Sequence, residues 1–179
     1  RDDTEAWAIV PFFWLPLDGL ADKADKDRVP YLAWLKAGHL EALPGHAINK
    51  RAVIKRMVEI TAGFELVAVA YDRWRIEDLK MMLEEEGVEL PLVEFGQGFR
   101  DMSPAVEEFE RLLLNEKLIQ PGNPVLTWMA ANAVVVQDPA GNRKLNKAKA
   151  AGRIDGMVSL TMAFGIAPDE AETVVPVAD

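Results

Sequence analysis

Asp72 is the first residue of this sequence whose position suits chemistry. It comes directly after the apolar run of residues 66–71, which is typical of a strand covered on both faces. The carboxyl end of such a strand is where α/β sheets place ligands and catalytic groups. An aspartate there also suits the cap of the helix that follows, and position alone gives the two interpretations equal weight.

Asp155 is the second candidate, in the first turn of a helix predicted over residues 153–165. The helix dipole favours a carboxylate in a first turn without any function, and taken alone this capping role is the favoured interpretation. Its neighbours on that face would be Ser159 and Met162, small or apolar side chains that predict an Asp155 facing protein. A carboxylate held there needs a partner, and a divalent cation shared with Asp72 would supply one.

A basic segment lies between the two aspartates in a chain whose net charge is −9. No acidic residue occurs from Pro139 to Ile154. Two interpretations weigh about the same: a solvated hairpin arm, or a strip that contacts phosphates and delivers a DNA backbone to the carboxylates. The basic residues are Arg143, Lys144, Lys147, Lys149 and Arg153.

Other kinds of site find no support in the sequence. The absence of cysteine excludes disulfides and thiolate metal sites, and it fits a reducing, intracellular setting. His39 and His46 are not spaced as metal ligands, and neither Ser103 nor Ser159 has a histidine at a telling distance. No GxxxxGK[ST] loop and no strand-linked GxGxxG occurs, so a nucleoside-triphosphate motor is not expected in this segment.

Length and composition fit one globular domain. The chain has 179 residues, of which 50% are hydrophobic and 27% charged. Its longest apolar run, residues 6–17, is too short to span a bilayer and follows acidic residues, so neither a membrane span nor a signal peptide is expected. The negative net charge argues against a protein that coats nucleic acid, but it permits an acidic site whose cations meet phosphate. The first residue is Arg rather than Met, so we expect a piece of a longer chain.

Alternating strands and helices predict an α/β domain without internal repeats. Strands are predicted at residues 5–14, 39–43, 66–70 and 90–95. Helices are predicted at residues 31–38, 49–61, 76–87, 103–113, 125–132 and 153–165. Asn49 and Ser103 are the predicted N-caps of two of these helices, the second followed by Pro104. Residues 132–146 predict a hairpin, residues 15–30 a polar, charged connection with some helical content, and residues 166–179 a tail of low structural content.

Six segments resemble, in order, the nuclease domain of large terminase subunits from tailed double-stranded DNA phages. The resemblance covers roughly residues 7–165, and six ordered segments make it more specific than any one motif. The segments are PFFWLP (11–16), VPYLAWLKAGHL (29–40), AYDRW (70–74), FGQGFRDMSPAVEEFERLL (95–113), GNPVLTWMAANAVV (122–135) and GRIDGMVSL (152–160).

The resemblance implies an RNase H-like fold, with a central mixed sheet flanked by helices, over residues 1–165. It implies a metal-dependent endonuclease that cuts concatemeric phage DNA during packaging, with an acidic cluster that binds two Mg²⁺ or Mn²⁺ ions. By motif, the aspartate of AYDRW corresponds to Asp72 and that of GRIDG to Asp155. Double-stranded DNA, the small terminase subunit and the portal protein are the implied partners, no membrane is involved, and the bacterial host's cytoplasm is the implied location.

One family feature is missing from this sequence. The first catalytic aspartate of the family lies on the opening strand, in a block like G-[IL]-D-[LF]-[ST], and no such block occurs here. We therefore expect the opening strand and the packaging ATPase to be missing from this chain, and the chain to cleave DNA poorly alone. The alternatives are a non-catalytic remnant or DNA-binding module that keeps the scaffold, and, more distantly, another RNase H-like nuclease such as a resolvase.

Overall fold

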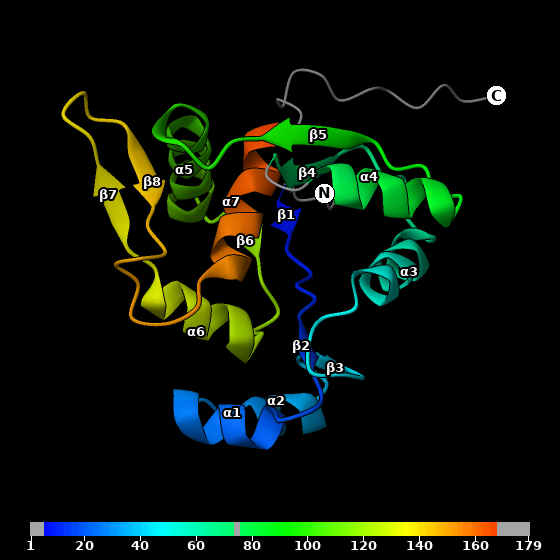
Figure 1. Cartoon of the computed structure of the whole chain (residues 1–179). Helices are drawn as coiled ribbons and strands as arrows, with labels where there is room; N and C mark the ends of the chain where they lie inside the picture. Colours follow the sequence, from blue (N-terminus) through cyan, green and yellow to red (C-terminus); the bar gives the residue numbers. More distant parts are fainter. Residues whose placement is uncertain (1–5, 74–75, 168–179) are drawn as a thin grey trace.

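The computed structural model describes residues 6–73 and 76–167, in which short strands alternate with helices (Figure 1). The strands are β1 (Trp7–Ala8), β2 (Trp14–Pro16), β3 (Glu41–Leu43), β4 (Val69–Asp72), β5 (Leu92–Phe95), β6 (Leu118–Ile119), β7 (Val135–Gln137) and β8 (Arg143–Leu145). The helices are α1 (Leu20–Asp27), α2 (Tyr31–Lys36), α3 (Lys50–Thr61), α4 (Ile76–Glu85), α5 (Phe99–Leu114), α6 (Pro124–Asn132) and α7 (Asp155–Ile166). The predicted α/β class is confirmed.

The strands pair two by two over the described residues. β1 pairs with β6, β2 with β3 and β4 with β5, each in parallel, whereas β7 and β8 form an antiparallel hairpin. The central sheet expected from the sequence is thus divided, in this part of the chain, into separate pairs. The β4–β5 register places Asp72 opposite Phe95, so the two strands end side by side.

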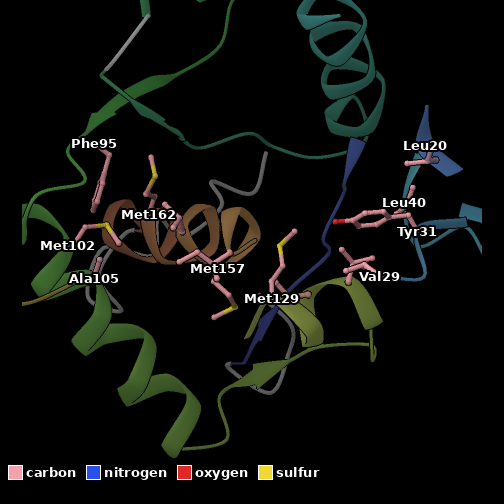
Figure 2. Close-up of a cluster of buried hydrophobic side chains, with 14 residues drawn as sticks. Leu20, Val29, Tyr31, Leu40, Phe95, Met102, Ala105, Met129, Met157 and Met162 are labelled. Atoms are coloured by element: carbon pink, nitrogen blue, oxygen red, sulfur yellow. The ribbon is translucent and has the colours of Figure 1, made fainter. Parts of the chain in front are cut away.

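Helix α7 lies at the centre of the core, with α5 and α6 packed against it and β4 in contact with it (Figure 1). Figure 2 shows Phe95, Met102 and Ala105 gathered at one part of α7, near Met162. Gly165 allows this close approach. A Cβ at Gly165 would lie 2.7 Å from Cζ of Phe95 and 2.9 Å from Cβ of Ala105, well inside van der Waals contact.

The predicted start of α5 is wrong. The helix begins at Phe99 with Gly98 as its N-cap, so Ser103 and Pro104 lie inside it. Ser103 is buried, and its Oγ accepts a hydrogen bond from the backbone N–H of Arg143 at 3.1 Å. A Ser-Pro pair is a common helix start. Here Met102, which precedes it, is also buried against the core, and this packing extends the helix toward the N-terminus.

Other boundaries differ more modestly from the predictions. The strand expected over residues 5–14 is two short strands with irregular backbone at 9–13, and the one expected over 66–70 is displaced to 69–72. The connection of residues 15–30 contains α1, as its expected helical content predicted. The Asn49 cap is confirmed, since its Oδ1 accepts from the N–H groups of Arg51 and Ala52. Across the described ranges, no helix is both long and apolar enough to cross a membrane.

Candidate functional site

Asp72 is the last residue of β4 and is held by the loop that follows β5. Its half-buried side chain accepts, at Oδ2, a hydrogen bond of 2.7 Å from Nε2 of Gln97. Gln97 is a contributor that sequence reasoning missed; its place between two glycines after a predicted strand was the available signal. The competing role of Asp72 as a cap of the next helix concerns residues 74–75, which lie outside the described residues.

Arg73 links the end of β4 to β5 and to the start of α5. Its Nε lies 3.4 Å from Oε1 of Glu94, and its Nη2 lies 3.1 Å from Oδ2 of Asp101. The Cα of Gly96 lies directly against this ion pair: a Cβ there would clash with the Asp101 carboxylate and the Arg73 guanidinium. The two ion pairs involve residues on both sides of Gln97 in the chain, but their side chains are well exposed, so each contributes little to stability.

Asp155 is the first residue of α7, and its side chain is 60% exposed. The prediction that it faces protein is therefore wrong. Ile154, Met157 and Val158 are all buried and take the inner face of the helix, which turns Asp155 outward. Oδ1 of Asp155 lies 2.9 Å from Nζ of Lys147, an ion pair that sequence spacing did not reveal.

Two hollows meet at Asp155. The first has a volume of about 440 Å³ and includes the aromatic side chains of Trp14, Tyr31 and Trp128. The second, of about 420 Å³, follows residues 9–14 and reaches Ser159. Asp155 borders both, so its exposed carboxylate is accessible from either hollow.

Gly156 lets residues 9–14 cross the first turn of α7. A Cβ there would lie 2.7 Å from Cε1 of Phe13 and 2.9 Å from Sδ of Met129. The backbone N–H of Gly156 also donates to Sδ of Met129, at 3.1 Å. The start of α7, and therefore the backbone of Asp155, is fixed by packing from two other segments.

Two of the five predicted DNA-contacting residues attach the β7–β8 hairpin to α5. Nη1 of Arg143 lies 2.6 Å from Oε2 of Glu110, and Nζ of Lys144 lies 4.7 Å from the centre of the Phe99 ring. Both basic side chains are half-buried. Their charge is therefore used at least in part within the molecule.

The other three predicted DNA contacts are exposed. Lys147 pairs with Asp155, and Lys149 is exposed on the same turn. Arg153 is exposed and lies beside Asp27 and Tyr31. Burial and the hydrogen bond to Asp27 raise the pKa of Tyr31, while Arg153 acts in the opposite direction. The basic segment is thus not one continuous strip, and only part of it faces solvent.

The donors suit a hard divalent cation, but their arrangement is incomplete in the described part of the chain. Carboxylate oxygens are the preferred ligands of Mg²⁺ and similar ions. Among the described residues, no group of three or more His, Cys, Asp or Glu side chains could hold a metal ion.

Different ends of α7 support the two aspartates. Phe95, the strand partner of Asp72, packs on Gly165, which lies ten residues after Asp155 and so roughly 15 Å along the helix axis. In Figure 1 the start of α7 lies beside α6 and its other end beside β4 and β5. A shared cation would have to join a carboxylate at the end of β4 to one in the first turn of α7.

Comparison with known proteins connects this geometry to a family. The chain is 48% identical over 168 residues to the large terminase subunit of Enterobacteria phage HK97, covering 94% of this chain and 33% of that protein. It is 25% identical to protein YmfN of Escherichia coli (strain K12), covering 90% of this chain and 36% of that one. The chain spans about a third of the length of both relatives.

Solved structures agree on the fold. The crystal structure of the HK97 large terminase matches with a TM-score of 0.89 over 93% of this chain and 35% of that one. The large terminase nuclease of thermophilic phage G20c with bound magnesium matches with a TM-score of 0.51 at 14% identity, over 67% of this chain and 63% of that one. The RNase H-like fold is thereby confirmed. The sequence-family model 'Terminase large subunit, endonuclease domain' matches residues 9–171, and the chain belongs to this family.

Proposed function

We propose that this chain is the nuclease part of a phage DNA-packaging terminase and hydrolyses phosphodiester bonds of concatemeric double-stranded DNA. The observation that carries the proposal is the match to the terminase endonuclease domain over residues 9–171. Because a related nuclease was crystallised with magnesium, Mg²⁺ or Mn²⁺ is the proposed cofactor.

Asp72 and Asp155 are the proposed metal ligands and catalytic carboxylates. Two bound cations would supply an activated water and stabilisation of the leaving oxygen. For this chemistry Asp72 offers a carboxylate already oriented by Gln97, and Asp155 offers one accessible at the junction of two hollows. The contact between β4 and α7 joins the two elements on which these residues lie.

DNA would be held through its backbone. Lys147, Lys149 and Arg153 are the proposed phosphate contacts, while Arg143 and Lys144 position the hairpin through α5 and add to the positive charge. Phosphate contacts carry no base information, so we expect little sequence specificity from the nuclease itself. The small terminase subunit, the portal protein and the bacterial cytoplasm remain proposals drawn from the family.

A second candidate is a non-catalytic remnant or DNA-binding module that keeps the terminase scaffold. Two observations favour it. The described residues contain no three-ligand group, and the supports of Asp72 and Asp155 lie at different ends of α7. Such a protein would bind DNA through its basic residues and bind cations only weakly.

Calorimetric titration with Mn²⁺ separates the two candidates. The nuclease proposal predicts binding that is lost in both Asp72→Asn and Asp155→Asn and retained in Asp22→Asn, an exposed control on α1. Under the same proposal, supercoiled plasmid is cut weakly with Mn²⁺ and not at all by the two site variants. Equal heats from all four proteins, with no cutting, would instead support the remnant.

A further inference from the structure

A braced turn presents Lys147 to the first turn of α7. The backbone N–H of Asn146 donates to the carbonyl of Val134 at 2.8 Å, which anchors the turn to the hairpin. Oδ1 of Asn146 then accepts from the N–H groups of Ala148 and Lys149, at 2.9 and 3.0 Å. These hydrogen bonds hold the backbone on both sides of Lys147, and the turn therefore keeps the lysine side chain within reach of Asp155.

The ammonium group occupies a place that a cation would need. Nζ of Lys147 lies 2.9 Å from Oδ1 of Asp155, whereas oxygen-liganded divalent ions sit roughly 2.0–2.6 Å from their ligands. An ammonium and a divalent cation on the same carboxylate repel each other, by an amount that solvent reduces at this exposed site. Occupancy by Lys147 and occupancy by a metal ion therefore compete.

Because the ion pair is exposed, replacing Lys147 by a metal ion at Asp155 costs little free energy. The Lys147 and Asp155 side chains are 49% and 60% exposed, and ion pairs this open to solvent are weak. A divalent ion with a second ligand would displace the lysine without unfolding the turn, because Asn146 and not Lys147 closes that turn.

We propose that Lys147 is the resident counter-cation of Asp155 and is exchanged for a divalent metal ion when the site is loaded. The inference rests on the proposed function, in which Asp155 is a metal ligand. Lys147 is then a positioning residue: it neutralises Asp155 in the metal-free protein and lowers the apparent metal affinity. On exchange, its ammonium group moves to the rim of the hollows, where a DNA phosphate is a partner of suitable charge.

The test is Mn²⁺ titration calorimetry of the full 179-residue chain and its variants. Lys147→Gln should raise the Mn²⁺ association constant about two- to fivefold, the value of an exposed ion pair. Lys149→Gln removes the same charge from the same turn and, in the described part of the chain, has no ion pair with Asp155. It should change the constant by less than about 1.5-fold, because screening weakens its more distant charge.

Two further proteins distinguish a specific exchange from a general effect of charge. Lys147→Arg restores a cation and should return the association constant to that of the wild type. In NMR spectra, the side-chain nitrogen of Lys147 should shift when Mg²⁺ is added to the wild type. In Asp155→Asn it should already differ before Mg²⁺ and should not respond further.

The outcomes separate this inference from the proposed function. If Mn²⁺ binding depends on Asp155 but Lys147→Gln and Lys149→Gln behave alike, the exchange is refuted while the metal role of Asp155 stands. If none of the proteins binds Mn²⁺, or if Asp155→Asn binds it as well as the wild type, the metal role of Asp155 is refuted, and the exchange is refuted with it. A gain confined to Lys147→Gln supports both.

Discussion

Replacement of Gly165 by alanine tests the packing on which the site is built. The new Cβ would lie 2.7 Å from Cζ of Phe95 and 2.9 Å from Cβ of Ala105. Overpacking of this kind costs typically about 1–3 kcal/mol. Alanine recovers about 1 kcal/mol through its helix propensity. The difference is a net loss of about 0–2 kcal/mol. Since the Cβ of Ala105 is fixed to its backbone and cannot rotate away, we expect the upper half of that range, about 1–2 kcal/mol.

The assay is urea unfolding followed by tryptophan fluorescence, with thermal melting alongside. A loss of about 1–2 kcal/mol corresponds to a melting temperature lower by about 2–8 °C in a domain of this size. Gly63→Ala is the matched control, because its Cβ would meet open space. It should leave the free energy of unfolding unchanged or raise it by up to about 1 kcal/mol.

A site consequence should accompany the loss of stability. Phe95 is the register partner of Asp72, so displacement of β5 should shift the amide resonances of Asp72 and Gln97. The reasoning is refuted if Gly165→Ala is as stable as Gly63→Ala. It is also refuted if the variant loses stability while the resonances of both residues stay in place.

Three further predictions follow from single contacts. Gly156→Ala should cost about 1 kcal/mol in urea unfolding, less than Gly165→Ala, because the flexible Met129 side chain can yield. Glu41→Gln should lower the free energy of unfolding by about 0.5–1 kcal/mol at pH 7, since hydrogen bonds from Arg56 hold the pKa of Glu41 below its ordinary 4.5. That stabilisation is present above pH 4.5 and is lost as pH falls through the lower folded-state pKa, so the two proteins should converge once the pH lies below that folded-state pKa. A double-mutant cycle of Arg143→Gln with Glu110→Gln should give a coupling of about 0.5–1 kcal/mol.

Each of these predictions has a result that contradicts it. An unchanged unfolding curve for Gly156→Ala would mean that Phe13 does not cross α7 as described. A stability difference for Glu41→Gln that does not shrink at all as the pH falls below 4.5 would exclude the ionised pair as its source. Zero coupling between Arg143 and Glu110 would mean that this ion pair does not help to hold the hairpin to α5, and it would return Arg143 to the set of available DNA contacts.

Local chemistry predicted the parts of the fold that depend on neighbouring residues. The Asn49 cap, the hairpin of β7 and β8 and the helix α7 all follow from short-range rules, and all are present. The start of α5 was missed because the Ser-Pro signature is local, whereas the burial of Ser103 against the hairpin is tertiary. No short-range rule contains that contact.

In the candidate site, too, short-range signals were readable from the sequence and tertiary contacts were not. The position of Asp72 at the end of a strand was readable from an apolar run, but its partner Gln97 becomes a neighbour only through β4–β5 pairing. The placement of Asp155 at the start of α7 was correct within two residues, but its exposure was not. Which face of α7 is buried depends on α5, α6 and residues 9–14 packing around it, and periodicity alone does not say which partner covers which face.

The central claim is that Asp72 and Asp155 act on the same bound cation, and paramagnetic broadening by Mn²⁺ tests it most directly. In a titration followed by NMR, the amides of Gln97 and Gly156 report on the two carboxylates separately. The account predicts that both signals broaden with one midpoint, and that Asp155→Asn abolishes the broadening at Gln97 as well as at Gly156. Broadening at only one of the two, or broadening at Gln97 that survives Asp155→Asn, would contradict it.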